Sequence, residues 1–354
     1  MNAIRQFFRK PFFIRLLHWE YWPFNVVYAP ILPVYACIAA RCRSLLFFNA
    51  ANPGIRYGGF LMESKNEIYQ LMPNGSYPST LYFPAGTAPE QVLTVVQEAG
   101  LSYPLIAKPD VGARGQGVRK LNGEADLRQY CIDSPLDFLV QAFVPYPLEA
   151  GIFYYRMPGE EKGRISGIVS KHFPSVKGDG KSSLRALAAA EERYILQLPD
   201  LEKILGPALD RVPAKGEEVE LLPFGNHARG ALFLDHSHLA DEALTEVIDR
   251  LCRQVEGFYY GRLDIRFRSW EGLREGRDFS VIELNASGSE PTHIYDPAHS
   301  IFFGWKEIIR HWRILARISR ANHRRGIPYL SWQEGRRMFR EQAAFEKKIR
   351  TIHV

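Results

Sequence analysis

The stretch from Phe279 to Pro291, FSVIELNASGSEP, decides how the rest of the sequence is interpreted. Its first half has the composition of a buried strand, in which side chains point alternately to the two faces of a sheet. That alternation places Glu283 and Asn285 on one face and Leu284 on the other. Because the Ser-Gly-Ser sequence that follows ends the strand, two oxygen-bearing side chains are expected to converge at a strand end.

A second polar strand, GRLDIRF, precedes this one and is separated from it by the charged segment WEGLREGR. It carries Asp264, with Arg262 and Arg266 on either side at a spacing of two. If the two strands pair as a hairpin, Asp264 faces Glu283 and Asn285, and together they form a hard-oxygen site of the kind that Mg²⁺ prefers. Arg262 would add a cation able to stabilise a transferring phosphoryl group or an oxyanion. Taken alone, the pattern also fits a surface hairpin with cross-strand ion pairs.

The composition is that of a globular protein with room for two or three packed lobes. The chain has 354 residues, of which 46% are hydrophobic and 24% are charged, so intrinsic disorder is excluded as its overall state. Its four cysteines include no CxxC pair, which favours a reducing compartment over a disulfide framework or a structural zinc site. Strands and helices alternate irregularly, with prominent antiparallel hairpins, and predict an α+β fold. The segment 181–197 is expected to form one helix.

Charge is distributed unevenly along the chain. Residues 1–50 have a net charge of +5, residues 305–354 have +9, and residues 51–304 have −8. Basic ends are compatible with nucleic acid or with an anionic membrane. Nucleic acid is not expected as a partner, because the basic helix WRILARISRANHRR lacks an aromatic stacking platform or a groove-reading fold.

The N-terminal region favours the membrane. The twenty residues from Tyr21 to Ala40 carry no charge, a length that could span a bilayer, and aromatic residues stand at its start. Pro23, Pro30 and Pro33 argue against one straight helix. Three alternatives remain open: a bent interfacial or monotopic segment, an apolar segment buried on the protein's own core, and a single transmembrane span.

A lysine and a glycine-rich turn predict a phosphate site. Lys108 ends the apolar strand YPLIAKPD, and the turn that follows contains Gly115 and Gly117, whose backbone N–H groups could close on phosphate oxygens. About thirty residues later a second apolar strand leads to Glu149, which could hydrogen-bond a ribose. The turn is neither a Walker A loop nor a Rossmann fingerprint.

This ordered set resembles the ATP-grasp superfamily over about residues 65–297. GRLD and ELN are similar to the Arg-x-Asp and Glu-x-Asn metal strands of D-alanine–D-alanine ligase, and VKGDGKSSLRAL resembles a segment of the cyanophycin synthetase type. The resemblance implies two α+β lobes that sandwich ATP. It divides the chain into an apolar, basic N-terminal segment (1–60), an ATP-grasp domain (61–300) and a basic helical C-terminal tail (301–354).

The resemblance also implies roles for the nucleotide-site residues. Lys108 would bind ATP phosphates under the loop at Gly115 and Gly117, and Glu149 would hold the ribose. The segment from Gln141 to Val144 would be the adenine hinge, although many family members have glutamate where Gln141 stands.

On the catalytic side, Lys171 would reach the γ-phosphate and Arg262 would stabilise the acyl-phosphate and tetrahedral states. Asp264, Glu283 and Asn285 would hold two Mg²⁺ ions, for which Mn²⁺ can substitute. Gly288 lies one place earlier than the corresponding glycine of the ligases, so the contact with the acyl oxyanion is expected to differ.

The activity implied is that of an ADP-forming ligase, which joins a carboxylate to an amine through an acyl phosphate. A thiol, hydroxyl or phosphate acceptor is the alternative, and a non-catalytic membrane-associated nucleotide-binding module is a third possibility. The substrate domain usual at the N-terminus is replaced by residues 1–60. Small or lipid-like substrates and a peripheral or monotopic position on the cytoplasmic face of the cell membrane are therefore expected.

Overall fold

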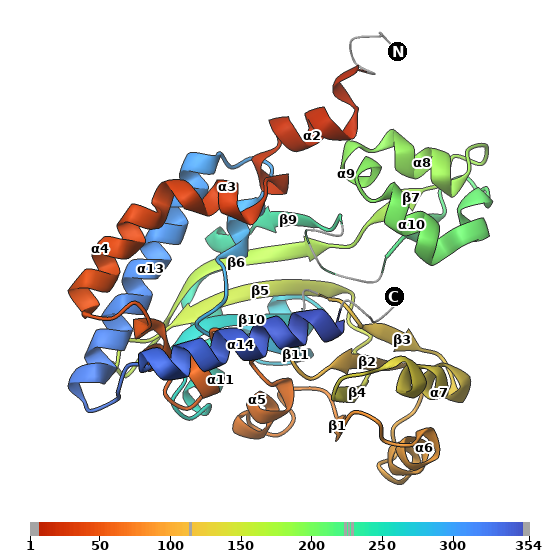
Figure 1. The fold of residues 1–354 in the computed structure, drawn as a ribbon. Coiled ribbons are helices and arrows are strands. Elements are labelled where there is room, and N and C mark those ends of the chain that lie inside the picture. Colours follow the sequence, from red (N-terminus) through yellow and green to blue (C-terminus); the bar gives the residue numbers. More distant parts are fainter. Residues whose placement is uncertain (1–6, 113–114, 223–224, 226, 228–229, 350–354) are drawn as a thin grey trace.

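The computed structural model describes residues 7–112, 115–222, 225, 227 and 230–349. A five-stranded antiparallel sheet in the order β11-β10-β5-β6-β9 lies at the centre, a four-stranded sheet in the order β1-β4-β2-β3 lies beside it, and β7 and β8 form a small third sheet (Figure 1). The α+β fold class predicted from the sequence is therefore confirmed. The strands are β1 (Thr80–Phe83), β2 (Leu105–Pro109), β3 (Arg119–Leu121), β4 (Phe138–Ala142), β5 (Leu148–Tyr155), β6 (Arg164–His172), β7 (Ser175–Lys177), β8 (Glu218–Glu220), β9 (Leu232–Asp235), β10 (Tyr260–Phe267) and β11 (Phe279–Asn285).

The helices include a long pair near the C-terminus and a bent helical run near the N-terminus. They are α2 (Pro11–Leu17), α3 (Phe24–Tyr28), α4 (Leu32–Cys42), α5 (Lys65–Leu71), α6 (Pro89–Glu98), α7 (Glu124–Asp133), α8 (Leu184–Ala190), α9 (Glu192–Ile195), α10 (Leu198–Leu205), α11 (Glu242–Arg253), α12 (Trp270–Arg274), α13 (Ile301–Arg324) and α14 (Trp332–Ile349).

Two local predictions from the sequence differ from the structure. The single helix expected over 181–197 is divided into α8 and α9, because Glu191 has an extended backbone (φ −95°, ψ 122°). This break lets the Tyr194 hydroxyl accept a hydrogen bond from the backbone N–H of Ser175. The charged connection between β10 and β11 contains the short helix α12, which Ser269 caps by accepting from the N–H of Gly272.

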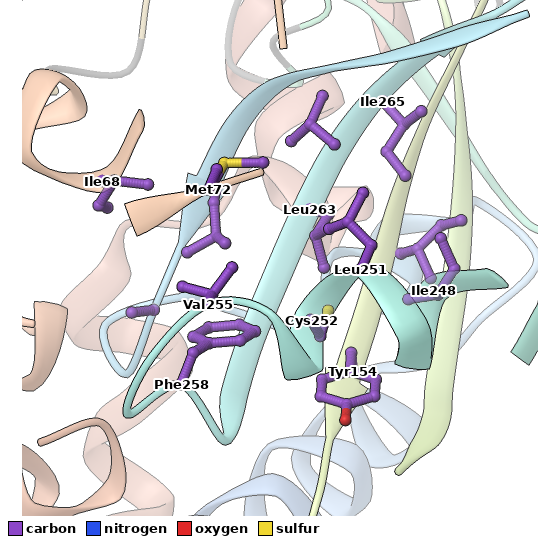
Figure 2. Packing of buried hydrophobic residues seen from close by; sticks show 14 of the residues in the cluster. Ile68, Met72, Tyr154, Ile248, Leu251, Cys252, Val255, Phe258, Leu263 and Ile265 are labelled. Carbon is purple, nitrogen blue, oxygen red and sulfur yellow. The ribbon is translucent and has the colours of Figure 1, made fainter. Parts of the chain in front are cut away.

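One face of the five-stranded sheet packs on α11. Alternate residues of β10, Leu263 and Ile265, point to this face and contact the apolar side of the helix, which carries Ile248 and Cys252 (Figure 2). Side chains of α5 complete the same cluster. Asp264 lies between Leu263 and Ile265 and therefore belongs to the opposite face.

That opposite face is divided into an apolar part and a charged part. Phe153 and Tyr260 form the apolar part, and they are covered by residues from both ends of the chain, including Phe47 and Ile318. In Figure 1 the run α3–α4 lies alongside α13, and the two elements contact one another. Residues 31–60 therefore contribute to the protein's own core.

The run from Phe24 to Cys42 is only partly buried. Among the described residues it is the one helical run that is long and apolar enough to cross a membrane, and 22% of it lies inside the protein. It bends at a 3₁₀ turn, η2 (Ala29–Ile31), which contains Pro30. Ile38, Ala39 and Cys42 are buried on one side of α4.

Helix α14 packs against two other parts of the protein. Met338 of α14 lies in the cluster that contains α4 and α13, whereas Phe345 and Ile349 contact Leu136 beside the four-stranded sheet. α14 therefore links the two parts of the molecule that carry the two larger sheets.

Asn52 attaches the N-terminal segment to β10. Its side chain is fully buried; it donates to the carbonyls of Gly58 (3.2 Å) and Tyr260 (2.9 Å) and accepts from the N–H groups of Tyr259 (2.9 Å) and Tyr260 (3.0 Å). One side chain thus satisfies four backbone groups in a region that water does not reach.

We predict that Asn52→Ala lowers the free energy of unfolding by about 3 kcal/mol or more, since each buried polar group left without a partner costs roughly 1–3 kcal/mol. Asn74→Ala, at an exposed position, should change it by less than about 0.5 kcal/mol. Urea unfolding followed by circular dichroism measures both values. Equal stabilities of the two variants would show that residues 47–60 are not part of the cooperative core.

Candidate active site

The charged part of the central sheet is built from register pairs on four neighbouring strands. Asp264 of β10 lies directly opposite Glu283 of β11, and Arg262 lies opposite Asn285. The same-face arrangement expected from the alternation of side chains is thus what the structure has.

A second row of charged residues crosses the sheet beside the first. In this row Lys171 of β6 pairs with Glu149 of β5, which pairs with Arg266 of β10. In the middle of the sheet, Gly151 leaves the space that Asp264 and Arg262 occupy.

Asp264 is the most strongly paired acid of the site. Arg262 donates to its two oxygens from Nε (2.8 Å) and from the second guanidinium nitrogen (3.1 Å), and Lys171 Nζ lies 3.0 Å from Oδ2. Burial raises the pKa of Asp264, but Arg262 and Lys171 outweigh burial and lower this pKa to about 2. The carboxylate is therefore ionised at any physiological pH.

Glu283 faces a different cation. Lys65, at the start of α5, places Nζ 3.3 Å from Oε1 of Glu283 and 3.4 Å from the carbonyl of Asp110. Burial and the charge of Asp264 raise the pKa of Glu283, but Lys65, Lys108 and Arg262 together outweigh them, so that the net pKa is lowered. A Cβ atom at Gly112 would come within 3.1 Å of Lys65 Nζ, so the glycine-rich turn begins directly over this pair.

Lys108 connects the two larger sheets. Its ammonium group, on β2, donates to the Tyr69 hydroxyl (2.9 Å), to Gln141 Oε1 (3.0 Å) and to the backbone carbonyl of Ile282 on β11 (3.0 Å). That carbonyl is available because the register between β10 and β11 shifts at this point, and Ile282 is the extra residue of the bulge. Burial lowers the pKa of Lys108 to about 8, although Glu283 and Asp110 oppose this effect.

Gln141 does not have the position expected of an adenine hinge. Its backbone lies inside the four-stranded sheet, where it pairs with Thr80 and Ile106, and its side-chain amide also donates to Tyr69 and Thr80. The part of the predicted adenine hinge that remains open to a base is therefore the part after β4, which is residues 143 and 144. Val144 is among these residues, and its carbonyl accepts a long hydrogen bond (3.5 Å) from Arg266.

Glu149 is more enclosed than a ribose-binding residue would be. Its oxygens accept from Lys171 (3.0 Å) and Arg266 (3.2 Å), and the carboxylate is buried. A Cβ atom at Gly225 would lie 2.7 Å from Oε1, so that only glycine fits above it. A ribose contact at Glu149 would require this loop and both ion pairs to rearrange.

The glycine-rich turn is described only in part, because residues 113 and 114 lie outside the described residues. Gly115 and Gly117 have φ angles of +80° and +72°, in the left-handed region that glycine adopts without strain. The carbonyl of Gly117 accepts from the buried Tyr130 hydroxyl (2.8 Å), which fixes the end of the turn to α7. These conformations are compatible with the predicted phosphate loop.

The segment after β11 is bonded to the N-terminal region. The N–H groups of Ser287 and Gly288 donate to the carbonyls of Gly58 (3.2 Å) and Gly59 (2.9 Å). They are consequently occupied and do not form an oxyanion site, which agrees with the altered glycine position in the sequence. Ser287 Oγ, at the same strand end, is buried without a hydrogen-bond partner among the described residues.

The donor set fits an ion that prefers oxygen ligands and is shared with a nucleotide. Asp264 and Glu283 provide two opposed carboxylates, and the side-chain amide of Asn285 has a buried Nδ2 without a described partner. A half-turn of that amide presents its oxygen instead, because the two orientations have nearly the same shape. Among the described residues, no group of three His, Cys, Asp or Glu side chains gathers as a metal centre, here or elsewhere, so the candidate ligands of this site are two carboxylates and one amide. Mg²⁺ commonly uses one or two carboxylates together with phosphate oxygens and water.

Two important residues were not identified from the sequence. Lys65 occupies the first turn of α5, where the helix dipole makes a cation unfavourable. This unfavourable position was the one sign in the sequence that Lys65 has a role other than helix formation. Glu63 accepts from the N–H of Ala286 (3.0 Å), and burial raises its pKa to about 8. Nothing in the sequence around Glu63 indicates that it lies beside Glu283.

Comparison with known proteins gives matches among solved structures. No protein-family model matches the chain, and no curated protein sequence matches it. A bifunctional glutathione synthetase from Pasteurella multocida is 16% identical over 69% of this chain (TM-score 0.37), and a D-alanine–D-alanine ligase from Bacillus anthracis is 11% identical over 77% (TM-score 0.41). A carboxyaminoimidazole ribonucleotide synthase from Aspergillus clavatus is 12% identical over 63% (TM-score 0.37).

The chain spans 36%, 70% and 44% of the lengths of these three enzymes, respectively. ATP-grasp enzymes are thus among the solved structures to which the chain is similar. The likeness is partial and concerns the fold.

We predict that Lys171→Met lowers the free energy of unfolding by about 3 kcal/mol, because removing one partner from a buried ion pair leaves charge uncompensated. Lys203→Met removes a lysine that is 75% exposed and should change stability by less than about 0.5 kcal/mol. Guanidinium unfolding at neutral pH measures the difference. A cost for Lys171→Met as small as that of the control would mean that the Glu149–Lys171–Asp264 network is not formed.

Proposed function

We propose that the chain is an ADP-forming ligase that uses Mg-ATP to join a carboxylate to an amine. The observation that carries this proposal is the convergence of basic side chains from both larger sheets and the intervening helix on the opposed pair Asp264 and Glu283. Lys65, Lys171 and Arg262 pair with these two carboxylates. Lys108 donates to the adjoining carbonyl of Ile282, and Arg266 pairs with Glu149 beside Lys171.

A buried cluster of charges such as this one is an inefficient way to stabilise a fold. Burying charges in a low-dielectric interior costs several kcal/mol per ion before pairing, and apolar side chains of similar volume are often as stable or more stable. Buried networks with perturbed pKa values are accordingly concentrated at functional sites. The surplus of lysine and arginine favours a ligand with several negative charges, and a triphosphate has this property.

In a nucleoside triphosphate bound at this site, some residues would contact the phosphates and their metal ion and others would contact the base. Lys108 and Lys171 would neutralise phosphate oxygens, with the turn at Gly115 and Gly117 closing over them. Asp264, Glu283 and Asn285 would hold Mg²⁺, which when bound neutralises charge on the phosphates and orients them. Val144 and the residues beside it would contact the base.

A ligase must first make a carboxylate reactive, because its leaving group would otherwise be oxide. Transfer of a phosphoryl group to the carboxylate gives an acyl phosphate, from which an amine displaces phosphate. Arg262 would stabilise the developing negative charge, because the N–H groups of Ser287 and Gly288 are already occupied. Closure of the two lobes would exclude water, which otherwise competes with the amine. Small or lipid-like molecules are the substrates expected.

The first test is nucleotide binding and its pH dependence. Lys108→Ala should weaken binding of a non-hydrolysable ATP analogue with Mg²⁺ at least tenfold, because a charge-assisted contact contributes roughly 1.5–3 kcal/mol. In the unaltered protein the affinity should fall as the pH rises through about 8, where Lys108 loses its proton. Lys108→Arg should lose the part of this pH dependence that Lys108 causes, because arginine stays charged, and should keep the part caused by Glu63, whose pKa is also about 8. Calorimetry with Lys203→Ala as the control measures all four proteins.

The titration of Lys108 does not itself destabilise the folded protein in this pH range. The pKa of Lys108 is lowered from its ordinary 10.5, so between about 8 and 10.5 the unfolded chain binds more protons than the folded chain. The contribution of Lys108 to the free energy of unfolding therefore increases with pH. An affinity that stays constant from pH 7 to 10 would contradict the role given to Lys108.

The second test concerns the metal ligands. Glu283→Gln is nearly isosteric and should preserve the fold, but it should lower ATP turnover by at least about 100-fold, since the loss of a metal-bound charge raises the barrier by roughly 3 kcal/mol. Turnover is measured as ADP release with a panel of carboxylates and amines, and hydroxylamine traps an acyl phosphate as a hydroxamate. Glu275→Gln, an exposed glutamate beyond α12, is the matched control. Unchanged turnover in Glu283→Gln would refute the assignment of the site.

A further inference from the structure

The outer surface of the N-terminal helices is apolar. Along α3 and α4 the exposed residues are almost all apolar or small, and no charged side chain interrupts them between Tyr21 and Ala40. We call the following exposed residues the α3–α4 apolar face: Phe24, Val26, Ala29, Leu32, Ala36, Cys37 and Ala40. Phe24 is 55% exposed and Leu32 is 54% exposed. A surface of this kind marks an interaction site in a folded protein.

A row of basic residues lies on the neighbouring helix. Exposed lysine and arginine recur on α13 at intervals of three, four or seven residues, which places them on one side of the helix. We call these residues the α13 basic stripe: Lys306, Arg313, Arg317, Arg320 and Arg324. Among the basic residues that the structure describes on α13, Arg310 is the one paired with a carboxylate, that of Glu307 (2.9 Å).

The apolar face and the basic stripe lie on two helices that pack side by side. α4 and α13 contact one another, and both bury their inner sides in the same cluster, through Ile38 of α4 and Ile314 and Ile318 of α13. Their outer sides are therefore adjacent. Three residues of the stripe, Lys306, Arg313 and Arg317, line a groove of about 340 Å³ together with Arg310 and Ile314.

We propose that the α3–α4 apolar face and the α13 basic stripe together dock onto an anionic phospholipid membrane. Charge complementarity selects this occupant, since unpaired cations beside an uncharged apolar helix match phosphate groups beside acyl chains. The basic groove offers room for a lipid headgroup. The cytoplasmic leaflet is the anionic one, so the protein would act there as a peripheral or monotopic protein.

The docking surface is also connected to the candidate active site. The Tyr28 hydroxyl of α3 donates to the carboxylate of Glu290, and the backbone carbonyl of Glu290 accepts from Arg262 (3.2 Å). One helix, with a diameter of about 10 Å, thus separates the docked membrane from this end of the site. The docking itself does not depend on the chemistry proposed for the site.

Flotation with phospholipid vesicles tests the proposal on the full chain. The protein should float with phosphatidylglycerol-containing vesicles and much less with pure phosphatidylcholine. Arg313→Gln with Arg317→Gln should reduce the partition coefficient about 30-fold, because each basic residue near an anionic surface contributes roughly a fivefold factor. The matched control is Arg250→Gln with Arg253→Gln, which removes two exposed charges from α11 on the opposite side of the central sheet. Equal flotation of the two double variants, or no flotation of the unaltered protein, would overturn the proposal.

A fluorescent label on Cys37 tests the apolar face separately. Cys37 is exposed on this face, whereas Cys42, Cys131 and Cys252 are buried, so an environment-sensitive maleimide reacts selectively with the native chain. Anionic vesicles should shift the emission to the blue and protect the label from iodide. A blue shift that appears without vesicles and increases with protein concentration would show that a second copy covers the face. Binding to duplex DNA in preference to vesicles would identify nucleic acid as the partner, and either result would refute the proposal.

Discussion

The hydrogen bonds to the backbone carbonyl of Ile282 join the two larger sheets at the candidate site. The Tyr69 hydroxyl (2.6 Å) and the Lys108 ammonium group (3.0 Å) both donate to this oxygen. In a regular ladder between β10 and β11, the Ile282 carbonyl would accept a hydrogen bond from the neighbouring strand. Because Ile282 is the extra residue of the bulge, its carbonyl is free to accept from Tyr69 and Lys108. Lys108, the buried cation of the four-stranded sheet, is thus held at β11, three strands away from Lys171 on β6 of the central sheet. Lys108 is held by hydrogen bonds and Lys171 by ion pairs with Glu149 and Asp264. These contacts fix the separation of the two sheets at the candidate site.

The sequence allowed the inner part of the site to be predicted and its surroundings only partly. The two-residue spacing of Glu283 and Asn285 was enough to place them on one face, because alternation is a local property of β-strands, and hairpin pairing of the two strands brings Asp264 to the same face. Lys65 and Gln141 have their roles through contacts with strands far along the chain, which local patterns do not encode. The position of Gln141 inside the sheet also depends on β1, a strand of four residues whose pairing no motif indicates. Helices and strands could therefore be predicted from the sequence more readily than the hydrogen-bond and ion-pair partners of individual polar side chains.

Helix α4 of the N-terminal segment has a buried side and an exposed side. Ile38, Ala39 and Cys42 are buried as in any core, while Leu32 of the same helix is more than half exposed. The difference follows from helical periodicity, since one side of α4 faces α13 and the other side has no described partner. An apolar composition by itself cannot distinguish these sides, because both are uncharged. The charges that distinguish them belong to α13, nearly 300 residues later in the chain.

That separation along the chain has a consequence for the synthesis of the protein. Ala39 packs in a cluster with Leu315, and a ribosome that adds about 5–20 residues per second reaches the second residue roughly 14–55 s after the first. During that interval the apolar helix has left the ribosome while its own partner helix does not yet exist. Nascent chains therefore expose both sides of the helix. A membrane or a chaperone that shields the segment in this period would protect the chain from aggregation, and the order of translation would make early contact with the membrane part of folding.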